Sequence, residues 1–248
     1  MAQMIKGLLS LSTQFKLKVN STIDHHTLCV ACLAPGATSG LCPQCLAQLP
    51  RNRWACRRCA LPLPGTAQPE ALCGQCQTQP PPFWLTEAPW LYHFPVDQLI
   101  GRYKYQRQLS LGHPLIHAFV DHMAQVLETH PERRPELMVP SPMHPKRQRQ
   151  RGFNQAEDIA EQLGCRLNIP WSITLIERSR SARRQSGLNR QQRQDNLRGI
   201  FQARGRAPRR VAIIDDVMTT GATARALAQA LASAGAQEIQ VWALARTP

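Results

Sequence analysis

Eight of the nine cysteines in this 248-residue chain fall into four Cys-x-x-Cys pairs, a spacing suited to metal binding. Each such turn presents two thiolates side by side, and four thiolates form the tetrahedral environment that structural zinc prefers. The chain opens without a convincing signal peptide, which favours metal-bound thiolates over a disulfide framework. We therefore expect two structural zinc ions, held by Cys29, Cys32, Cys42, Cys45, Cys56, Cys59, Cys73 and Cys76.

The gaps between the pairs suggest how the ligands combine. Nine residues separate the first pair from the second, and thirteen separate the third from the fourth. These gaps suit two ribbon-like sites formed in sequence order, and a cross-braced pairing is also compatible with them. Closed sites of this kind stabilise a fold and leave no open position on the metal, so we expect no zinc chemistry. The ninth cysteine, Cys165, is expected to be a small core residue after a helix that ends at Gly164.

A second group of reactive side chains follows the apolar run Val211–Ile214. That run is typical of a strand buried in a parallel sheet, so the next two acids would lie at its carboxyl end, where open α/β sheets bind ligands. A turn of small residues then opens a helix, whose first N–H groups suit a phosphate. Carboxylates beside it suit ribose hydroxyls or Mg²⁺. The predicted sugar-phosphate site comprises Asp215, Asp216, Thr219, Thr220, Gly221, Ala222 and Thr223.

Residues 211–223 resemble the phosphoribosyl pyrophosphate (PRPP) signature of type I phosphoribosyltransferases. That signature has four apolar residues, two acids, three mostly apolar residues and then Thr-Gly-Gly-Thr. Here Ala222 replaces the second glycine, and Thr219 takes the third spacer position. The resemblance implies that PRPP binds here together with Mg²⁺. It makes a PRPP-dependent transferase one hypothesis, but no residue identifies an acceptor pocket and none is assigned as catalytic.

Positive charge is concentrated in the central third of the chain. Residues 133–210 hold 18 Lys+Arg and 6 Asp+Glu, a balance of 18 − 6 = +12 within a total of +14. Charge of one sign predicts a polyanionic partner, such as a pyrophosphate, a nucleotide or a nucleic-acid backbone. The same residues could bind a leaving pyrophosphate, contact DNA phosphates, or only keep the surface soluble. The candidates are Lys146, Arg147, Arg149 and Arg151.

Two further patterns narrow the family. The segment Lys146–Ala156 contains Arg-Gly-Phe-Asn-Gln, just after a Pro-Ser-Pro turn. The second pattern consists of Gln185, Leu188, Arg193, Asn196 and Phe201. Together with the cysteine pairs and the PRPP-like segment, they resemble the ComF/GntX family over residues 29–247. The resemblance implies a competence or DNA-utilisation protein, with a phosphoribosyl ligand, single-stranded DNA and DNA-uptake or DNA-processing proteins as candidate partners.

These residues must be positioned by an alternation of strands and helices. Strands are expected at 137–140, 211–214 and 239–244, and helices at 113–127, 154–163 and 223–234. A strand, turn, helix and strand within about 35 residues form a βαβ unit. The expected fold class is α/β: a type I phosphoribosyltransferase-like doubly wound parallel sheet, preceded by a small double zinc-ribbon domain. We expect an N-terminal extension at 1–26, the double ribbon at 27–80 and the phosphoribosyltransferase-like domain at 81–248.

Composition excludes several classes of protein. Hydrophobic residues make up 43% of the chain and charged residues 19%, which is typical of folded proteins and not of disordered ones. No apolar run approaches the roughly 18 residues of a membrane span, so a cytoplasmic protein is expected. Two functions remain open: a protein that binds PRPP, with turnover as one hypothesis, and a non-catalytic scaffold with a degenerate PRPP site that binds single-stranded DNA or a partner.

Overall fold

The computed structural model describes residues 28–37, 39–65, 68, 70–106, 109–178 and 199–248. The predicted N-terminal extension and the pattern residues Gln185, Leu188, Arg193 and Asn196 lie outside these ranges. The chain packs into two compact units, Met1–Ala47 and Gln48–Pro248. The domain boundaries expected at residues 27 and 81 stay predictions.

The first unit is small and is organised around its cysteines. Its described helix is α2 (Pro43–Ala47), which begins directly after Cys42. The backbone N–H groups of Cys29 and Leu33 close the first turn by donating to Ala34 O and Cys29 O, both at 2.8 Å.

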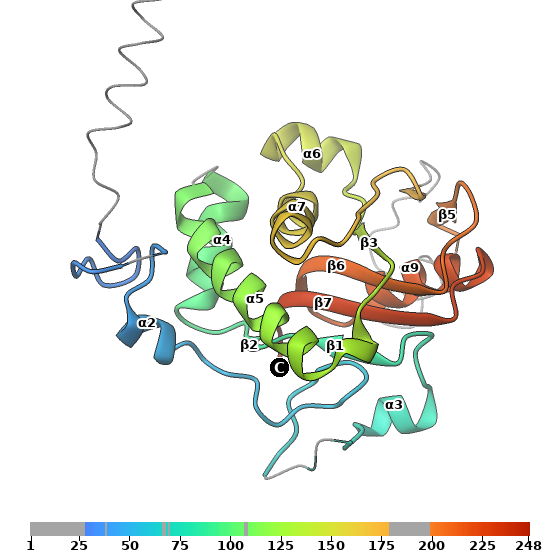
Figure 1. The fold of residues 1–248 in the computed structure, drawn as a ribbon, viewed down its shortest axis with the longest axis horizontal. Helices are drawn as coiled ribbons and strands as arrows, with labels where there is room; N and C mark the ends of the chain where they lie inside the picture. The colour runs from blue at the N-terminus through green and yellow to red at the C-terminus, as the bar shows by residue number, and fades with distance from the viewer. Residues whose placement is uncertain (1–27, 38, 66–67, 69, 107–108, 179–198) are drawn as a thin grey trace, which may run out of the picture. The chain divides into compact units, whose positions relative to one another are not determined.

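The second unit is built on a five-stranded parallel sheet (Figure 1). The strands are β1 (Leu85–Glu87), β2 (Trp90–Leu91), β3 (Leu137–Pro140), β6 (Arg210–Met218) and β7 (Glu238–Arg246). Their order is β1-β7-β6-β3, and β2 pairs with β7 beyond the end of β1. The two central strands carry continuous apolar runs, Val211–Ile214 in β6 and Val241–Ala245 in β7, as strands covered on both faces require.

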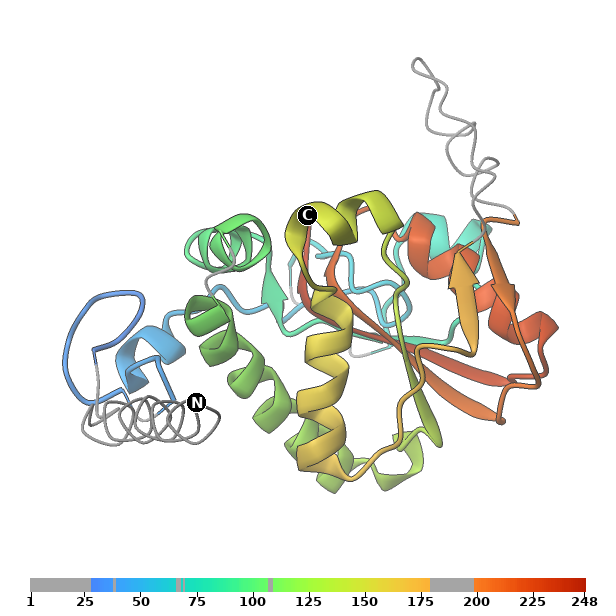
Figure 2. The same cartoon turned by 90° about the horizontal axis from the view of Figure 1, so that it is seen from above.

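Helices cover both faces of this sheet, which confirms the expected doubly wound α/β fold. On one face α7 (Gln155–Leu167) packs on β3 and β6, beside α5 (Leu109–Thr129) and α4 (Val96–Gln106). On the other face α9 (Ala222–Ser233) packs on β6 and β7. Figure 2 shows α5 and α7 on the side of the strands opposite α9. Each crossover, from β3 to β6 and from β6 to β7, therefore uses a different face.

Shorter elements complete the second unit. A helical turn, η1 (Pro131–Arg133), precedes β3, and α6 (Pro145–Arg151) follows it. The strands β4 (Ile176–Arg178) and β5 (Phe201–Ala203) pair antiparallel beside α9. The helix α3 (Gly74–Thr78) begins directly after Cys73. In the described ranges we find no helix with the length and apolar character needed to cross a membrane.

Three sequence expectations about helices need correction. The helix expected at 113–127 begins at Leu109, so Pro114 lies inside it and not in its first turn. The helix expected to stop at Gly164 continues to Leu167 and ends at Asn168, whose φ is +52°. Gly164 serves packing instead, because a Cβ there would lie 2.9 Å from Cδ1 of Trp171. The longer helix also turns Cys165 outward, so this cysteine is exposed and not in the core.

Candidate functional site

The eight paired cysteines form two separate groups. Cys29, Cys32, Cys42 and Cys45 make the first group, and Cys56, Cys59, Cys73 and Cys76 make the second. Within each group the four Sγ atoms all lie within 4.8 Å of one another. The ligands thus combine in sequence order, and the cross-braced alternative is not what the structure contains.

The sulfur positions fit a tetrahedral metal ion. Four sulfurs bound at about 2.3 Å from a zinc ion lie about 3.8 Å from one another. The Sγ atoms of Cys32 and Cys42 are 3.7 Å apart, and those of Cys59 and Cys73 are 3.6 Å apart. Four thiols and no hard oxygen ligand favour zinc over calcium or magnesium. Both groups therefore fit a closed structural site.

The two cysteine groups repeat the same two local backbone features. In each, the residue after the first Cys-x-x-Cys turn has a positive φ, +62° at Leu33 and +53° at Ala60. Its N–H donates to the carbonyl of the first cysteine of that turn, at 2.8 Å in both cases. In each, the second cysteine pair opens a five-residue helix, α2 or α3. This local repeat brings four sulfurs together from two short turns.

Hydrogen bonds lower the pKa of one thiol in each cysteine group. A hydrogen bond from the Cys59 side chain, with backbone N–H groups, lowers the pKa of Cys56 to about 4 against the opposing effect of burial. In the first group burial would raise the pKa of Cys29, but backbone N–H groups of Cys42, Cys32 and Ala31 lower it to about 6. A thiolate is the form that binds metal, so each group already favours the ligand state at one position.

The second cysteine group belongs to the hydrophobic core of the sheet. Its four side chains are all buried, and they share one cluster with Met218, Ala224, Leu227 and Val241. The edge strand β1 also bonds to this segment, since Thr86 N donates to Arg57 O at 3.1 Å. The cysteine segment therefore covers the face of β6 and β7 that carries α9.

The predicted acidic pair lies near the carboxyl end of β6. This strand does not end at Ile214 as expected but continues to Met218. Because side chains alternate along a strand, the two neighbouring carboxylates leave opposite faces of the sheet. Asp215 lines a cavity of about 30 Å³ together with the loop from Thr219 to Thr223. Asp216 lies on the other side, in contact with α4.

Asp215 is protonated more easily than an ordinary aspartate. Burial, and then the charge of Asp216, raise its pKa to about 7. The N–H of Asp216, which donates to Asp215 Oδ1 at 2.9 Å, and the charge of Lys104 both oppose this rise. A carboxyl that titrates near neutral pH, in a cavity beside a helix N-terminus, has the character of a ligand-binding group.

Lys104 is a candidate site residue that sequence reasoning missed. Its Nζ lies 2.9 Å from Asp216 Oδ1, and the two side chains are only 13% and 14% exposed. The preceding residue holds this lysine in place, because the Tyr103 hydroxyl donates to Asp158 and the ring packs edge-on against Phe153 at 5.1 Å. No motif marks Lys104, since a lysine on an amphipathic helix is usually a solvated one.

The turn after β6 has the form expected for a phosphate loop. Thr219 and Thr220 are exposed, and Gly221 has a φ of +72° before α9 begins at Ala222. The first helical bond runs from Arg225 N to Gly221 O at 2.9 Å, so the N–H groups of residues 222–224 precede it. Such N–H groups at a helix N-terminus can bind a phosphate.

The basic helix α6 lies at the same edge of the sheet. Pro140 at the end of β3 is paired with Ile214 of β6, and Ser141 N donates to Ile214 O at 2.9 Å. The helix begins four residues later, and Lys146, Arg147 and Arg149 are exposed on it. Four of its seven residues are cationic and none is acidic, so this edge carries a local positive charge.

The Arg-Gly-Phe-Asn-Gln segment is the corner that connects α6 to α7. Gly152 ends α6 with a φ of +83°, and the Asn154 side chain caps α7 by accepting from Ala156 N at 3.2 Å. Arg151 donates to Gln155 Oε1 at 3.0 Å and is half-buried, unlike the other three cations. The segment thus sets the position of α6 at the N-terminal end of α7 through a tight turn and a helix cap.

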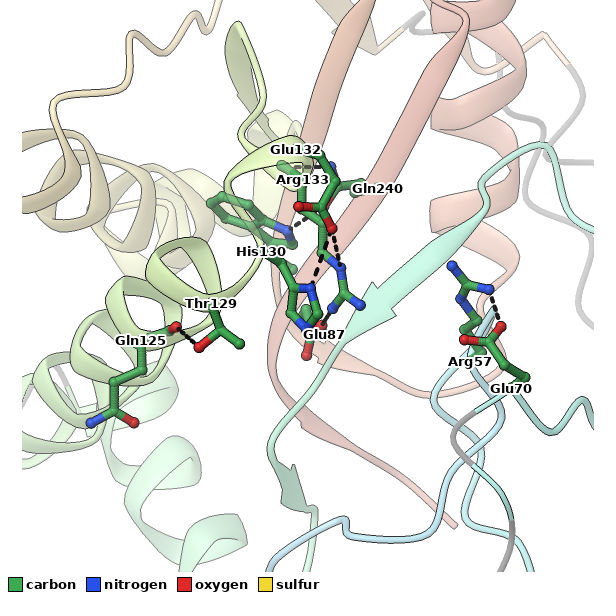
Figure 3. Close-up of polar contacts among 10 residues, drawn as sticks. Arg57, Glu70, Glu87, Gln125, Thr129, His130, Glu132, Arg133 and Gln240 are labelled. Carbon is green, nitrogen blue, oxygen red and sulfur yellow. Dashed lines mark hydrogen bonds and ion pairs between the residues drawn. The ribbon is translucent and has the colours of Figure 1, made fainter.

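A larger cavity of about 440 Å³ lies elsewhere in the second unit. Four arginines and two glutamates line it, and two of these arginines are paired with the glutamates. Figure 3 shows Arg133 against Glu87, at 3.2 Å, and Arg57 against Glu70. The Gln240 side chain supports this arrangement by donating to Arg133 O at 2.7 Å. Because α6 combines exposed cations with no acidic residue, it is the clearer candidate for a polyanion.

Comparison with known proteins identifies relatives over most of the chain. Competence protein F of Haemophilus influenzae is 34% identical over 214 residues, which cover 85% of this chain and 92% of that protein. DNA utilization protein YhgH of Escherichia coli K12 is 30% identical over 223 residues, covering 89% and 97%. Competence protein ComFC of Streptococcus pneumoniae is 28% identical over 182 residues, covering 70% and 74%.

Two other comparisons complete this account. No protein-family model matches the chain. Among solved structures, a purine phosphoribosyltransferase from Pyrococcus horikoshii matches with a TM-score of 0.35 and 18% identity, covering 54% of this chain and 74% of that one. The identity to Competence protein F, over almost all of that protein, is what decides the family. This chain belongs to the ComF family.

Proposed function

We propose that this protein binds a phosphoribosyl ligand of the PRPP type, with Mg²⁺, and acts in the use or uptake of DNA. The observation that carries the proposal is that three groups lie at the same edge of the sheet. These are the carboxyl of Asp215, the helix-opening loop from Thr219 to Thr223, and the cations of α6. Together they match a molecule with a sugar diol and two separate phosphate groups.

Each group has a chemical role in this proposal. The N–H groups and hydroxyls of Thr219, Thr220, Gly221, Ala222 and Thr223 would bind the 5-phosphate. Asp215 would accept hydrogen bonds from the ribose hydroxyls, or bind the Mg²⁺ that accompanies the pyrophosphate. Asp216 and Lys104 would set the charge around it from the other face of the strand. The exposed α6 cations, Lys146, Arg147 and Arg149, would neutralise the pyrophosphate, with Arg151 behind them.

Turnover is a separate question from binding. In a phosphoribosyltransferase reaction, a nucleophile forms a bond to the anomeric carbon while the bond to pyrophosphate breaks and pyrophosphate leaves with its electron pair. We assign no catalytic residue, so ligand binding is the proposed function and transfer is its extension. The alternative is a scaffold that binds single-stranded DNA or a protein partner. The exposed cations of α6 and the names of the relatives, which refer to competence and DNA utilization, favour a DNA-related role.

The cysteines also support proposals about the bound metal and about the location of the protein in the cell. We propose that both cysteine groups hold structural zinc, because four closely spaced thiols fit that ion. Reduced cysteines that bind metal are typical of the cytoplasm, and we propose that location.

Calorimetric titration of the zinc-loaded protein with PRPP and Mg²⁺ tests the proposal. Heat in the parent and none in the Asp215→Asn/Asp216→Asn variant would support a phosphoribosyl site at this edge. Asp121→Asn is the matched control, since Asp121 is an exposed aspartate on α5. The single variants add detail, because Asp215 lines the loop cavity and should matter more than Asp216. Silence in the parent would reject the ligand and leave the DNA or partner scaffold.

A further inference from the structure

Arg246, the last residue of β7, has unusual surroundings for an arginine. It is only 5% exposed. Its Nε donates to Cys59 O at 2.9 Å, and its Nη1 donates to Met218 O at 3.0 Å and also to Thr219 O. Among the described residues it forms no ion pair with an aspartate or glutamate. One buried side chain thus bonds both to a cysteine of the second group and to the start of the ligand loop.

A buried guanidinium needs a compensating negative charge. Carbonyl oxygens satisfy its N–H groups but carry no net charge. The second cysteine group can supply negative charge, since its members Cys59, Cys73 and Cys56 act electrostatically on Arg246. Four thiolates around one divalent zinc ion have a net charge of −2. A metal-loaded second site would therefore supply the counter-charge that this arginine lacks.

We propose that Arg246 is a positioning residue that connects the second cysteine site to the ligand loop. The metal–thiolate charge holds the guanidinium, and the guanidinium holds the carbonyls of Met218 and Thr219. Metal in the second site, but not in the first, then sets the order of the loop. The consequence for ligand affinity rests on the proposed PRPP site; the consequence for loop order does not.

Further contacts join the same two regions. Met218 and Ala224, at the two ends of the loop, share the buried cluster of the second cysteine group. Arg225 in the first turn of α9 donates to Gln79 O at 3.1 Å, and Gln79 follows α3. Thr247 N also donates to Met218 O at 3.1 Å, so the end of the chain supports the same carbonyl. The loop is thus joined to the cysteine segment by shared apolar packing and by a hydrogen bond.

Hydrogen exchange of the full-length protein tests this without any ligand. The variants Cys56→Ser/Cys76→Ser and Cys29→Ser/Cys45→Ser would each remove one metal site, and the second of them is the matched control. We expect exchange in a peptide covering residues 217–224 to rise at least about tenfold on loss of the second site and to stay unchanged on loss of the first. Equal exchange in the two variants would overturn the proposal.

The variant Arg246→Lys distinguishes the effect of the Arg246 hydrogen bonds from the effect of the metal. Lysine retains the positive charge but lacks the planar guanidinium group of arginine. Its ammonium group therefore cannot donate to the carbonyls of Cys59, Met218 and Thr219 in the way that Arg246 does. We expect this variant to keep two metal ions per chain and still to show faster exchange at residues 217–224. If residues 217–224 exchange as slowly as in the parent while both metal ions are bound, the hydrogen bonds of Arg246 do not order the loop, and the proposal is wrong.

Reciprocal linkage gives a readout that a purely structural role would not change. If the metal site favours ligand binding, the ligand must favour metal retention by the same factor. In Cys29→Ser/Cys45→Ser, PRPP with Mg²⁺ should raise the zinc affinity, measured by equilibrium competition with a chromogenic chelator, by at least about fivefold. In Arg246→Lys the effect should fall towards onefold while PRPP still binds. An equal effect in both proteins would contradict the proposal. If PRPP does not bind the parent, the exchange experiment alone decides the loop's dependence on metal.

Discussion

Lys104 of α4 and Asp216 of β6 form an ion pair of 2.9 Å that is largely shielded from solvent. It joins a helix near the start of the second unit to the acidic pair beside the ligand loop. Since Asp215 lies on the opposite face of the same strand, Lys104 influences that carboxyl through charge and not through contact. The ion pair is thus part of the electrostatics of the candidate site.

Replacing Lys104 should make Asp215 still harder to ionise. The charge of Lys104 lowers the pKa of Asp215, which burial and Asp216 raise to about 7. We expect Lys104→Met to move that pKa upward, and Lys104→Arg to leave it near the parent value. Carboxyl chemical shifts followed through a pH titration would measure both. An unchanged midpoint in Lys104→Met would show that Lys104 has no electrostatic effect on Asp215.

Ligand binding should weaken in acid through the same carboxyl. Ribose hydroxyls and Mg²⁺ bind the ionised form, which is lost as pH falls through about 7. We expect the affinity for PRPP with Mg²⁺ to fall about tenfold for each unit of pH well below that value. Calorimetry between pH 5.5 and about 8.5 would measure this trend. A flat profile in the parent would mean that Asp215 does not contact the ligand.

Asp215→Asn should stabilise the fold at alkaline pH. A carboxyl whose folded pKa is raised from 3.8 to about 7 binds its proton more tightly when folded. Folding stability is therefore lost as pH rises from about 4 to 7, and the loss is complete above 7. Asparagine is never ionised and its Oδ1 can still accept from Asp216 N. We expect a gain of about 1–3 kcal/mol at pH 8, absent near pH 4, by denaturant unfolding. A gain that is the same at both pH values would refute this reasoning.

The two metal sites should lose zinc at different rates. Cys32 in the first group is exposed, whereas all four cysteines of the second group are buried. Metal analysis should find about two zinc ions per chain, and a chelator should remove one much faster than the other. Cys29→Ser/Cys45→Ser should abolish the fast phase alone. Fewer than about one zinc ion per chain would reject the double site.

Neutralising α6 should reduce the salt dependence of DNA binding. Each phosphate contact to a single strand contributes about 0.7 to the slope of log affinity against log salt. Changing the exposed Lys146, Arg147 and Arg149 to Gln should lower that slope by about 2, as measured by fluorescence anisotropy with an oligonucleotide. The matched control changes three exposed arginines elsewhere, Arg102, Arg166 and Arg206. Equal slopes for the two variants would show that α6 is not the contact surface.

The sequence predicted the parts of the molecule that depend on local pattern. The spacing of the four cysteine pairs predicted two four-thiolate groups and left two pairings open, of which the structure contains the one in sequence order. The apolar run before Asp215 likewise predicts the central strand and the turn into α9. Gly164 shows the limit of this reasoning. Glycine usually ends a helix, but here the ring of Trp171 requires it, and that contact depends on tertiary packing.

The residues that sequence reasoning missed act at long range. Lys104 meets Asp216 across 112 positions of the chain, and Arg246 meets Cys59 across 187. Neither belongs to a motif, because a single buried cation is recognised only from what surrounds it. The same applies to the ends of β6, since the pairing of Val217 and Met218 with β7 is what extends that strand past the acids.

The second cysteine group covers one face of the sheet. This limits how far the chain can be shortened from its N-terminal side. A chain that began at residue 81 would keep every strand of the sheet but would remove four buried sulfurs from the face that carries α9. The apolar side chains of Leu227, Val241 and Met218 would then meet water, and such a patch promotes self-association. In this molecule the second cysteine group covers a hydrophobic core, and the α/β sheet is not complete without it.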